Sequence, residues 1–165
     1  MGSTWVEVTF DVPQVRSSDF SPSCADAYVL TFELTQDKRA CNFFVSCVAD
    51  MLGYHGLDGM TASRMVRFMQ TKGWLISRTQ AMADAAKGDL VIGGLTAAQI
   101  PEVTMGHVNI VRPGSVKAYQ WGDIYVPKCA NVSISPDPNL TFHDRGEDYA
   151  FPKLAQPEYF HVPLP

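Results

Sequence analysis

The 165-residue sequence has little charge and no long apolar run. Charged residues make up 18% and hydrophobic residues 46%, and 13 Lys and Arg against 17 Asp and Glu give a net charge of −4. The hydrophobic fraction excludes a disordered or collagen-like chain. Nucleic-acid binding and adhesion to an anionic membrane both need clustered basic residues, so the acidic balance argues against them. Nothing approaches the roughly 18 apolar residues that insertion through a bilayer requires.

The N-terminus lacks the features of an export signal. Its first residues, MGSTWVEVTF, contain neither a basic n-region nor an apolar h-region. We therefore expect synthesis in the cytoplasm without a secretory leader. The length suits a single domain, which can bury roughly 70% of its unfolded surface and so form a core without a metal or a disulfide.

Cysteine is sparse, and its spacing argues against two common structural uses. No two of the four cysteines, Cys24, Cys41, Cys47 and Cys129, form a CxxC pair. A tetrahedral zinc site is therefore not expected, and four cysteines are too few for a disulfide scaffold in a chain this long. Cys41 and Cys47 would lie on different faces of a helix, because successive residues are about 100° apart around its axis. One disulfide, between Cys24 and Cys129, stays an open alternative.

The spacing of the hydrophobic residues predicts strands, then helices, then strands again. Alternation with polar residues predicts two early strands, over residues 6–12 and 27–35. Spacing near 3.6 residues predicts three helices, over residues 40–52, 61–73 and 79–87. Thr61 is a suitable N-cap for the second helix, and each helix ends near a glycine, at Gly53, Gly73 and Gly88.

From Asp89 onward the pattern is that of strands. Apolar runs at residues 90–92, 108–111 and 124–126 are separated by glycines and by Pro113-Gly114. Residues 136–165 hold six of the 11 prolines, so we expect this part to be extended and wrapped over the surface. The predicted fold class is α+β, with N-terminal helices packed on an antiparallel β-sheet.

Cys41 is the cysteine whose setting suits chemistry. It stands at the start of the first predicted helix, two residues after Lys38-Arg39. The N–H groups and dipole of a helix N-terminus, together with nearby cations, lower a thiol pKa and favour the nucleophilic thiolate. Most cysteines are instead small buried hydrophobic residues, and Cys47, beside Phe44 and Val48 in mid-helix, fits that description.

His107 is the histidine placed to act as a base. It follows Gly106 and opens the predicted strand over residues 108–111, which leaves one face of the imidazole for a partner. Histidine can take a thiol proton near neutral pH and return it to a leaving amine. The other histidines, at His55, His143 and His161, lie in less ordered settings and are weaker candidates.

Three segments follow one another in a distinctive order. They are Cys41-Asn42-Phe43-Phe44-Val45 with Ala49–Gly53, then Asp89-Leu90-Val91-Ile92-Gly93-Gly94-Leu95, then Gly106-His107-Val108-Asn109-Ile110-Val111. This layout, over residues 38–135, resembles the NlpC-type superfamily of papain-like cysteine peptidases, and within it the amidase effectors of bacterial type VI secretion. A permuted relative, the lecithin:retinol acyltransferase type, places histidine before cysteine. The order here therefore favours amide hydrolysis over lipid acyl transfer.

The resemblance implies a catalytic pair, Cys41 and His107, and a third polar residue that orients the imidazole from the next strand. Asn131 is the first choice for that residue, with Cys129 and Asp123 as alternatives. The resemblance implies no metal and no other cofactor. Four basic residues are candidate partners for substrate carboxylates: Arg39, Arg64, Arg78 and Lys128.

The implied substrate is a peptidoglycan stem peptide. The bond cut would be γ-D-glutamyl–meso-diaminopimelate or the D-alanyl–diaminopimelate cross-link, and the sequence leaves both open. As a type VI effector, the protein would reach the periplasm of target bacteria and would have a cognate immunity protein. The alternatives are a phage or autolytic cell-wall hydrolase, a protein-directed cysteine peptidase or deamidase, and a catalytically inactive peptide-binding module.

Overall fold

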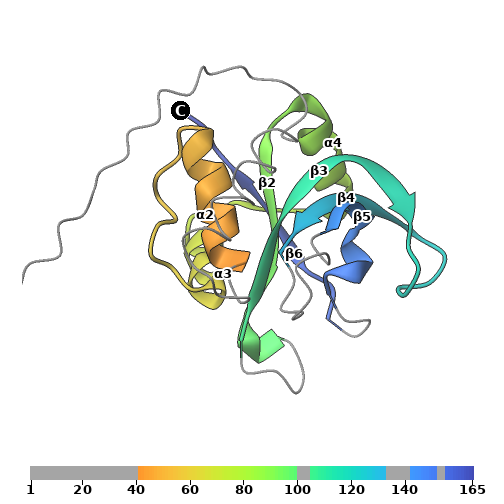
Figure 1. Ribbon diagram of the computed structural model, residues 1–165. Coiled ribbons are helices and arrows are strands. Elements are labelled where there is room, and N and C mark those ends of the chain that lie inside the picture. Colours follow the sequence, from red (N-terminus) through yellow and green to blue (C-terminus); the bar gives the residue numbers. More distant parts are fainter. Residues whose placement is uncertain (1–40, 100–104, 133–141, 152–154) are drawn as a thin grey trace, which may run out of the picture.

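The computed structural model describes residues 41–99, 105–132, 142–151 and 155–165 (Figure 1). Within them, one six-stranded antiparallel sheet has the strand order β1-β6-β2-β3-β4-β5. Its strands are β1 (Leu75–Ile76), β2 (Leu90–Leu95), β3 (His107–Lys117), β4 (Tyr125–Asn131), β5 (Phe142–Gly146) and β6 (Glu158–Val162). The predicted α+β class, with an antiparallel sheet, is confirmed. The two strands expected at residues 6–12 and 27–35 lie outside the described residues, as does Cys24.

The helices form close to where their periodicity predicts them: α2 (Cys41–Met51), α3 (Ala62–Thr71) and α4 (Arg78–Lys87). Thr61 caps α3 as expected, its hydroxyl accepting from the Arg64 N–H at 3.3 Å. Helix α4 begins a residue earlier than predicted because the Ser77 hydroxyl accepts from the Gln80 N–H and serves as the N-cap. Gly88 ends α4 with a left-handed φ of 90°.

Helices α2 and α3 cover one face of the sheet, as Figure 1 shows, and the larger core lies between them and the strands. Their apolar stripes meet alternate residues of three neighbouring strands. The fully buried members of this core include Val45, Val48, Met65, Val66, Met69, Leu90, Ile92, Val108, Ile110, Phe160 and Val162. Burying side chains of this size contributes about 1.5–3 kcal/mol each, so this face anchors the start of α2 against the sheet. No helix among the described residues is long and apolar enough to cross a membrane.

Helix α4 covers part of the opposite face. Ala81 and Ala85 pack there against Val91, Val111 and Tyr159. Val91 and Ile92 therefore enter different clusters although they are adjacent, because successive side chains of a strand point to opposite faces. Strand β2 is buried along its whole length, which explains its nearly continuous apolar run.

The proline-rich end of the chain departs from the prediction. Residues 158–162 are extended as expected, but they do not wrap over the surface: as β6 they lie inside the sheet, between β1 and β2. Phe160 is completely buried in the main core. Pro157 and Pro163 stand just outside the strand, so no N–H is missing from its ladder. The two prolines therefore flank a strand inside the sheet and do not prevent it from forming.

The hairpin of β3 and β4 also differs from the expected pattern. Pro113-Gly114 was expected to separate strands, yet β3 continues through it with a register shift between Arg112 and Ser115. Gly114 takes a left-handed φ of 98° at this irregularity. The bulge accommodates Pro113, which has no N–H to donate to the ladder.

Candidate active site

Cys41 is the first described residue of α2 and is almost completely buried. The following turns hold its position, because Phe44, Val45 and Val48 are buried against the sheet. Backbone hydrogen bonds from Asn42 and Val108 reach the Cys41 sulfur. The thiol therefore lies where the start of α2 meets the start of β3.

His107 is the first residue of β3 and pairs with Leu95 of β2. Its side chain is buried, and the Phe151 ring lies edge-on to the imidazole at 5.2 Å between centroids. Gly106 permits the close approach of α3, since a Cβ there would lie 2.5 Å from the Ser63 hydroxyl oxygen and 2.6 Å from the Leu95 carbonyl oxygen. The glycine before the histidine is therefore required by packing.

Asn131, at the end of β4, contacts the imidazole as predicted. Its Oδ1 lies 2.5 Å from His107 Nε2, and both side chains are buried. With the Nε2 proton donated to Asn131, the other ring nitrogen carries the lone pair. Nδ1 is buried, and because Nε2 is engaged by Asn131, Nδ1 is the ring nitrogen that is left for the thiol.

The two predicted catalytic residues shift each other's pKa toward an ion pair. Burial raises the pKa of the Cys41 thiol, but the charge and hydrogen bond of His107 and the two backbone hydrogen bonds outweigh burial and leave the pKa lowered. Burial likewise lowers the pKa of His107, and the charge and hydrogen bond of Cys41, with Asn131, raise it on balance. Both shifts therefore move the pair in the direction of thiolate and imidazolium.

The alternatives to Asn131 lie elsewhere. Asp123 is exposed in the β3–β4 hairpin, where its carboxylate is 2.5 Å from the Lys117 ammonium. Cys129 is buried on β4, where its β3 neighbour is Val111, and Cys24, the other half of the alternative disulfide, lies outside the described residues. Cys47 packs against the main core, and burial raises its pKa to about 11, in keeping with a structural role.

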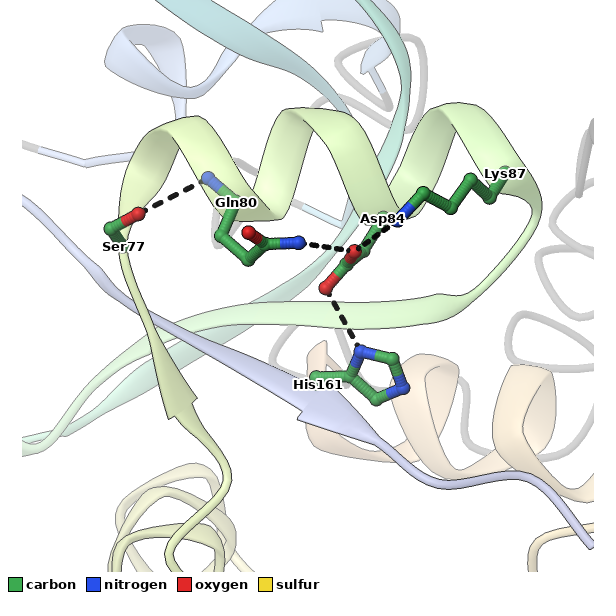
Figure 2. Close-up of polar contacts among 5 residues, drawn as sticks. All are labelled: Ser77, Gln80, Asp84, Lys87 and His161. Atoms are coloured by element: carbon green, nitrogen blue, oxygen red, sulfur yellow. Dashed lines mark hydrogen bonds and ion pairs between the residues drawn. The ribbon is translucent and has the colours of Figure 1, made fainter.

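The weaker histidine candidates have other partners where the structure describes their side chains. His55 is exposed and lies 2.9 Å from the Asp50 carboxylate. His161 of β6 lies on the α4 face, where its Nδ1 is 3.0 Å from Asp84 Oδ2 (Figure 2). Asp84 also accepts from Gln80 at 2.6 Å and from Lys87 at 3.3 Å.

Asp84, Asp89 and His161 are the described residues that come closest to a metal-ligand set, with one ligand atom of each within 4.8 Å of the others. Both Asp84 oxygens, however, already accept hydrogen bonds, and Lys87 supplies a positive charge to one of them. Burial raises the Asp84 pKa, and the hydrogen bonds from His161, Gln80 and Lys87 more than compensate and lower it. The cluster is a satisfied polar contact that ties α4 to β6.

The basic residues proposed to bind substrate carboxylates do not form one group. Arg78 donates to Gln156 and lies over the Trp121 ring at 5.8 Å, so its side chain is already engaged. Arg64 is exposed on α3, Lys128 lies half-buried on β4, and Arg39 lies outside the described residues. Of residues 96–106, which connect β2 to His107, the structure describes 96–99 and 105–106.

A buried polar pair behind His107 was not anticipated. Asn109 of β3 donates to Glu147 Oε2 at 2.9 Å, and both residues are fully buried. Glu147 begins the short 3-10 helix η3 (Glu147–Tyr149). One signal in the sequence was available: Asn109 follows His107 by two residues in a β-branched run, and so lies on the same face of the strand.

Comparison with known proteins gives no relative for this site: neither a protein-family model nor a curated protein sequence matches the chain. The arrangement is therefore interpreted from its own chemistry. A buried thiol with a lowered pKa, an imidazole beside it and an amide that fixes the ring are the parts of a cysteine nucleophile with its base.

Proposed function

We propose that this chain is a papain-like, NlpC-type cysteine amidase that cleaves peptide bonds in bacterial peptidoglycan. The observation that carries the proposal is the contact of Cys41, His107 and Asn131, brought together from α2, β3 and β4. The order of the segments around Cys41 and His107, which resembles the type VI amidase effectors, supports the choice of substrate.

In the proposed mechanism the thiolate of Cys41 attacks the carbonyl carbon of the scissile amide. The carbonyl π electrons move to oxygen, and the backbone N–H of Cys41 helps to stabilise the resulting oxyanion. As the tetrahedral intermediate collapses, the C–N bond breaks and the proton on His107 Nδ1 passes to the leaving amine. Neutral His107 then deprotonates a water molecule, whose attack on the thioester releases the acid and restores the thiol.

Asn131 has a positioning role in this scheme. By accepting from Nε2 at 2.5 Å it fixes the ring orientation and tautomer, so that Nδ1 faces the sulfur. The same contact contributes to the raised pKa of His107 and so stabilises the imidazolium form. All three side chains that a Cys-His amidase uses are thus present, which argues against an inactive peptide-binding module.

Digestion of purified peptidoglycan, followed by mass analysis of the released muropeptides, tests the proposal. Wild-type protein should release new fragments, and their masses would show whether the γ-D-glutamyl bond or the cross-link is cut. Cys41→Ala should release none, whereas Cys47→Ala is the matched control on the same helix and should retain activity. No new fragments from folded wild-type protein would refute the proposed substrate and favour a protein-directed peptidase or deamidase.

We further propose delivery to the periplasm of target bacteria by type VI secretion, with a cognate immunity protein that covers the site at Cys41. Expression directed to the periplasm should lyse cells only when Cys41 is intact. Co-expression of the product of an adjacent reading frame should protect them. A protein that binds tightly but leaves muropeptide release unchanged would contradict the immunity proposal.

A further inference from the structure

Glu147 is a carboxyl group buried beside the proposed catalytic histidine without a complete set of hydrogen bonds. It is fully inaccessible to solvent, and its Oε2 accepts from Asn109 Nδ2 at 2.9 Å. Its other oxygen, Oε1, has no hydrogen-bond partner among the described residues, and neither has Asn109 Oδ1. A buried carboxylate left in this state would be costly, because each of its oxygens needs donors.

The two oxygens without partners converge on the same spot, above Gly93 of β2. A Cβ built on Gly93 would lie 2.7 Å from Asn109 Oδ1 and 2.8 Å from Glu147 Oε1. The absent side chain therefore provides the space in which the carboxyl and amide groups lie together. Both oxygens are acceptors when the carboxyl group is ionised, whereas a protonated carboxyl group has an O–H that can donate to the amide oxygen.

Charged and titratable groups face Glu147 from several elements. Burial raises its pKa most strongly, the Asn109 hydrogen bond and the charge of His107 lower it, Asp148 raises it and Arg78 lowers it, and the outcome is about 8. Tyr159 faces it from β6, and its own pKa is raised by burial and by Glu147. The Arg78 guanidinium is partly committed elsewhere, because it donates to Gln156 and lies over the Trp121 ring at 5.8 Å.

We propose that Glu147 is a positioning residue that is held as a neutral carboxylic acid in a cyclic pair with the Asn109 side chain. Oε2 accepts from the amide N–H, and the Oε1–H donates to the amide oxygen. The pair ties η3 to β3 two residues beyond His107 and gives that histidine an uncharged neighbour. This inference rests on the proposed catalytic role of His107, but its test does not require hydrolysis of peptidoglycan.

The protonation state is measured directly by NMR on the full chain labelled with ¹³C at the glutamate side-chain carboxyl. One glutamate resonance should titrate near pH 8, and it should be absent in Glu147→Gln. Glu158→Gln is the matched control, because that carboxylate accepts from Gln70 and Gln99 on the surface and its removal should leave the high-titrating resonance in place. If every glutamate of the wild type titrates in the ordinary range, the proposal is overturned, whether or not a variant folds.

The positioning role is measured by the reactivity of Cys41. Alkylation by iodoacetamide, followed by mass analysis of the Cys41 peptide, gives a rate at each pH. Glu147→Gln can make the same two hydrogen bonds through its amide. Its alkylation rate should therefore rise with pH in the acidic range as that of the wild type does, which is the acid limb of the pH–rate profile. Glu147→Met has a similar shape without them and should react about tenfold more slowly in its folded fraction, because small misplacements of a base are costly.

Two results of this assay count against the inference. A shift of the acid limb in Glu147→Gln would mean that a negative charge had been removed, so Glu147 would be ionised in the wild type. Equal rates for wild type, Glu147→Gln and Glu147→Met would mean that the pair does not position His107. Neither result bears on peptidoglycan cleavage, so the failure of this inference is distinguishable from the failure of the proposed function.

Discussion

The stability of the protein should depend on pH through Glu147, and replacement by glutamine should remove that dependence. The pKa of Glu147 is about 8 in the folded protein and 4.5 for an ordinary glutamate. Because the folded value is the higher one, the folded protein binds more protons between these pH values. The stabilisation from the acid is therefore fully present below pH 4.5 and is lost as the pH rises to about 8.

The size of the effect follows from the difference between the two pKa values. The difference between 4.5 and about 8 corresponds to at most about 5 kcal/mol, since each unit is worth about 1.4 kcal/mol. That is a large part of the total of about 5–15 kcal/mol by which most domains are stable. Glu147→Gln cannot ionise, so its free energy of unfolding should not include this loss.

Urea denaturation of both proteins at a series of pH values gives the comparison. The difference in free energy of unfolding between wild type and Glu147→Gln isolates Glu147, because the other titrating groups are common to both. From pH 4.5 upward the wild type should lose free energy of unfolding relative to Glu147→Gln, and this loss should level off above the folded pKa of about 8. A difference that stays constant with pH, or moves the other way, would refute the reasoning.

Three further perturbations have defined outcomes. Asn131→Ala should lower kcat for muropeptide release by about 100-fold, because the imidazole loses its orienting acceptor, while KM changes little; an unchanged kcat would contradict the assigned role. Gly106→Ala should destabilise the fold by about 1–3 kcal/mol in thermal or urea unfolding, because the added methyl group overlaps the Ser63 hydroxyl and the Leu95 carbonyl; wild-type stability would show that the contact relaxes at no cost. Asp84→Asn should lower the free energy of unfolding by about 1–3 kcal/mol at pH values above the folded pKa of Asp84, where the carboxylate accepts from His161. This destabilisation should diminish as the pH falls through that pKa. A destabilisation that is independent of pH would contradict the charged contact.

The parts of the site that could be predicted depend on local signals. Cys41 stands at a recognisable helix start after two basic residues, and His107 follows a glycine at a recognisable strand start. Asn131 was chosen because the resemblance implied a polar residue on the strand after His107. In the structure the end of β4 does return beside the start of β3, since antiparallel strands joined by a hairpin are neighbours. The local patterns gave each residue its element, and the resemblance, not the local spacing, brought Cys41 and His107 together.

The parts that could not be predicted depend on distant contacts. Glu147 stands in a polar, proline-containing region and has the sequence context of a surface acid. Only the fold shows that it meets Asn109 and the open space above Gly93. The Gly93-Gly94 pair inside a buried strand was nevertheless a usable signal, because glycine in a strand interior often marks a close approach.

Strand β6 could not be assigned for a related reason. Proline density is a local measure, and it indicates an irregular segment. Glu158–Val162 lies in the sheet because it pairs with both β1 and β2 and because Phe160 and Val162 pack in the main core. Pairing partners so far apart in sequence leave no mark in the local pattern.

The position of β6 has a consequence for the order of assembly. The ladder from β1 to β2 passes through residues 158–162, so β2, the neighbour of the strand that begins at His107, has an unpaired edge until those residues have been synthesised. Contacts between segments so distant in sequence form slowly, because the intervening chain has to be ordered first. Helix α2, which carries Cys41, can therefore form early, whereas the sheet is complete only when β6 has paired with β2 late in folding.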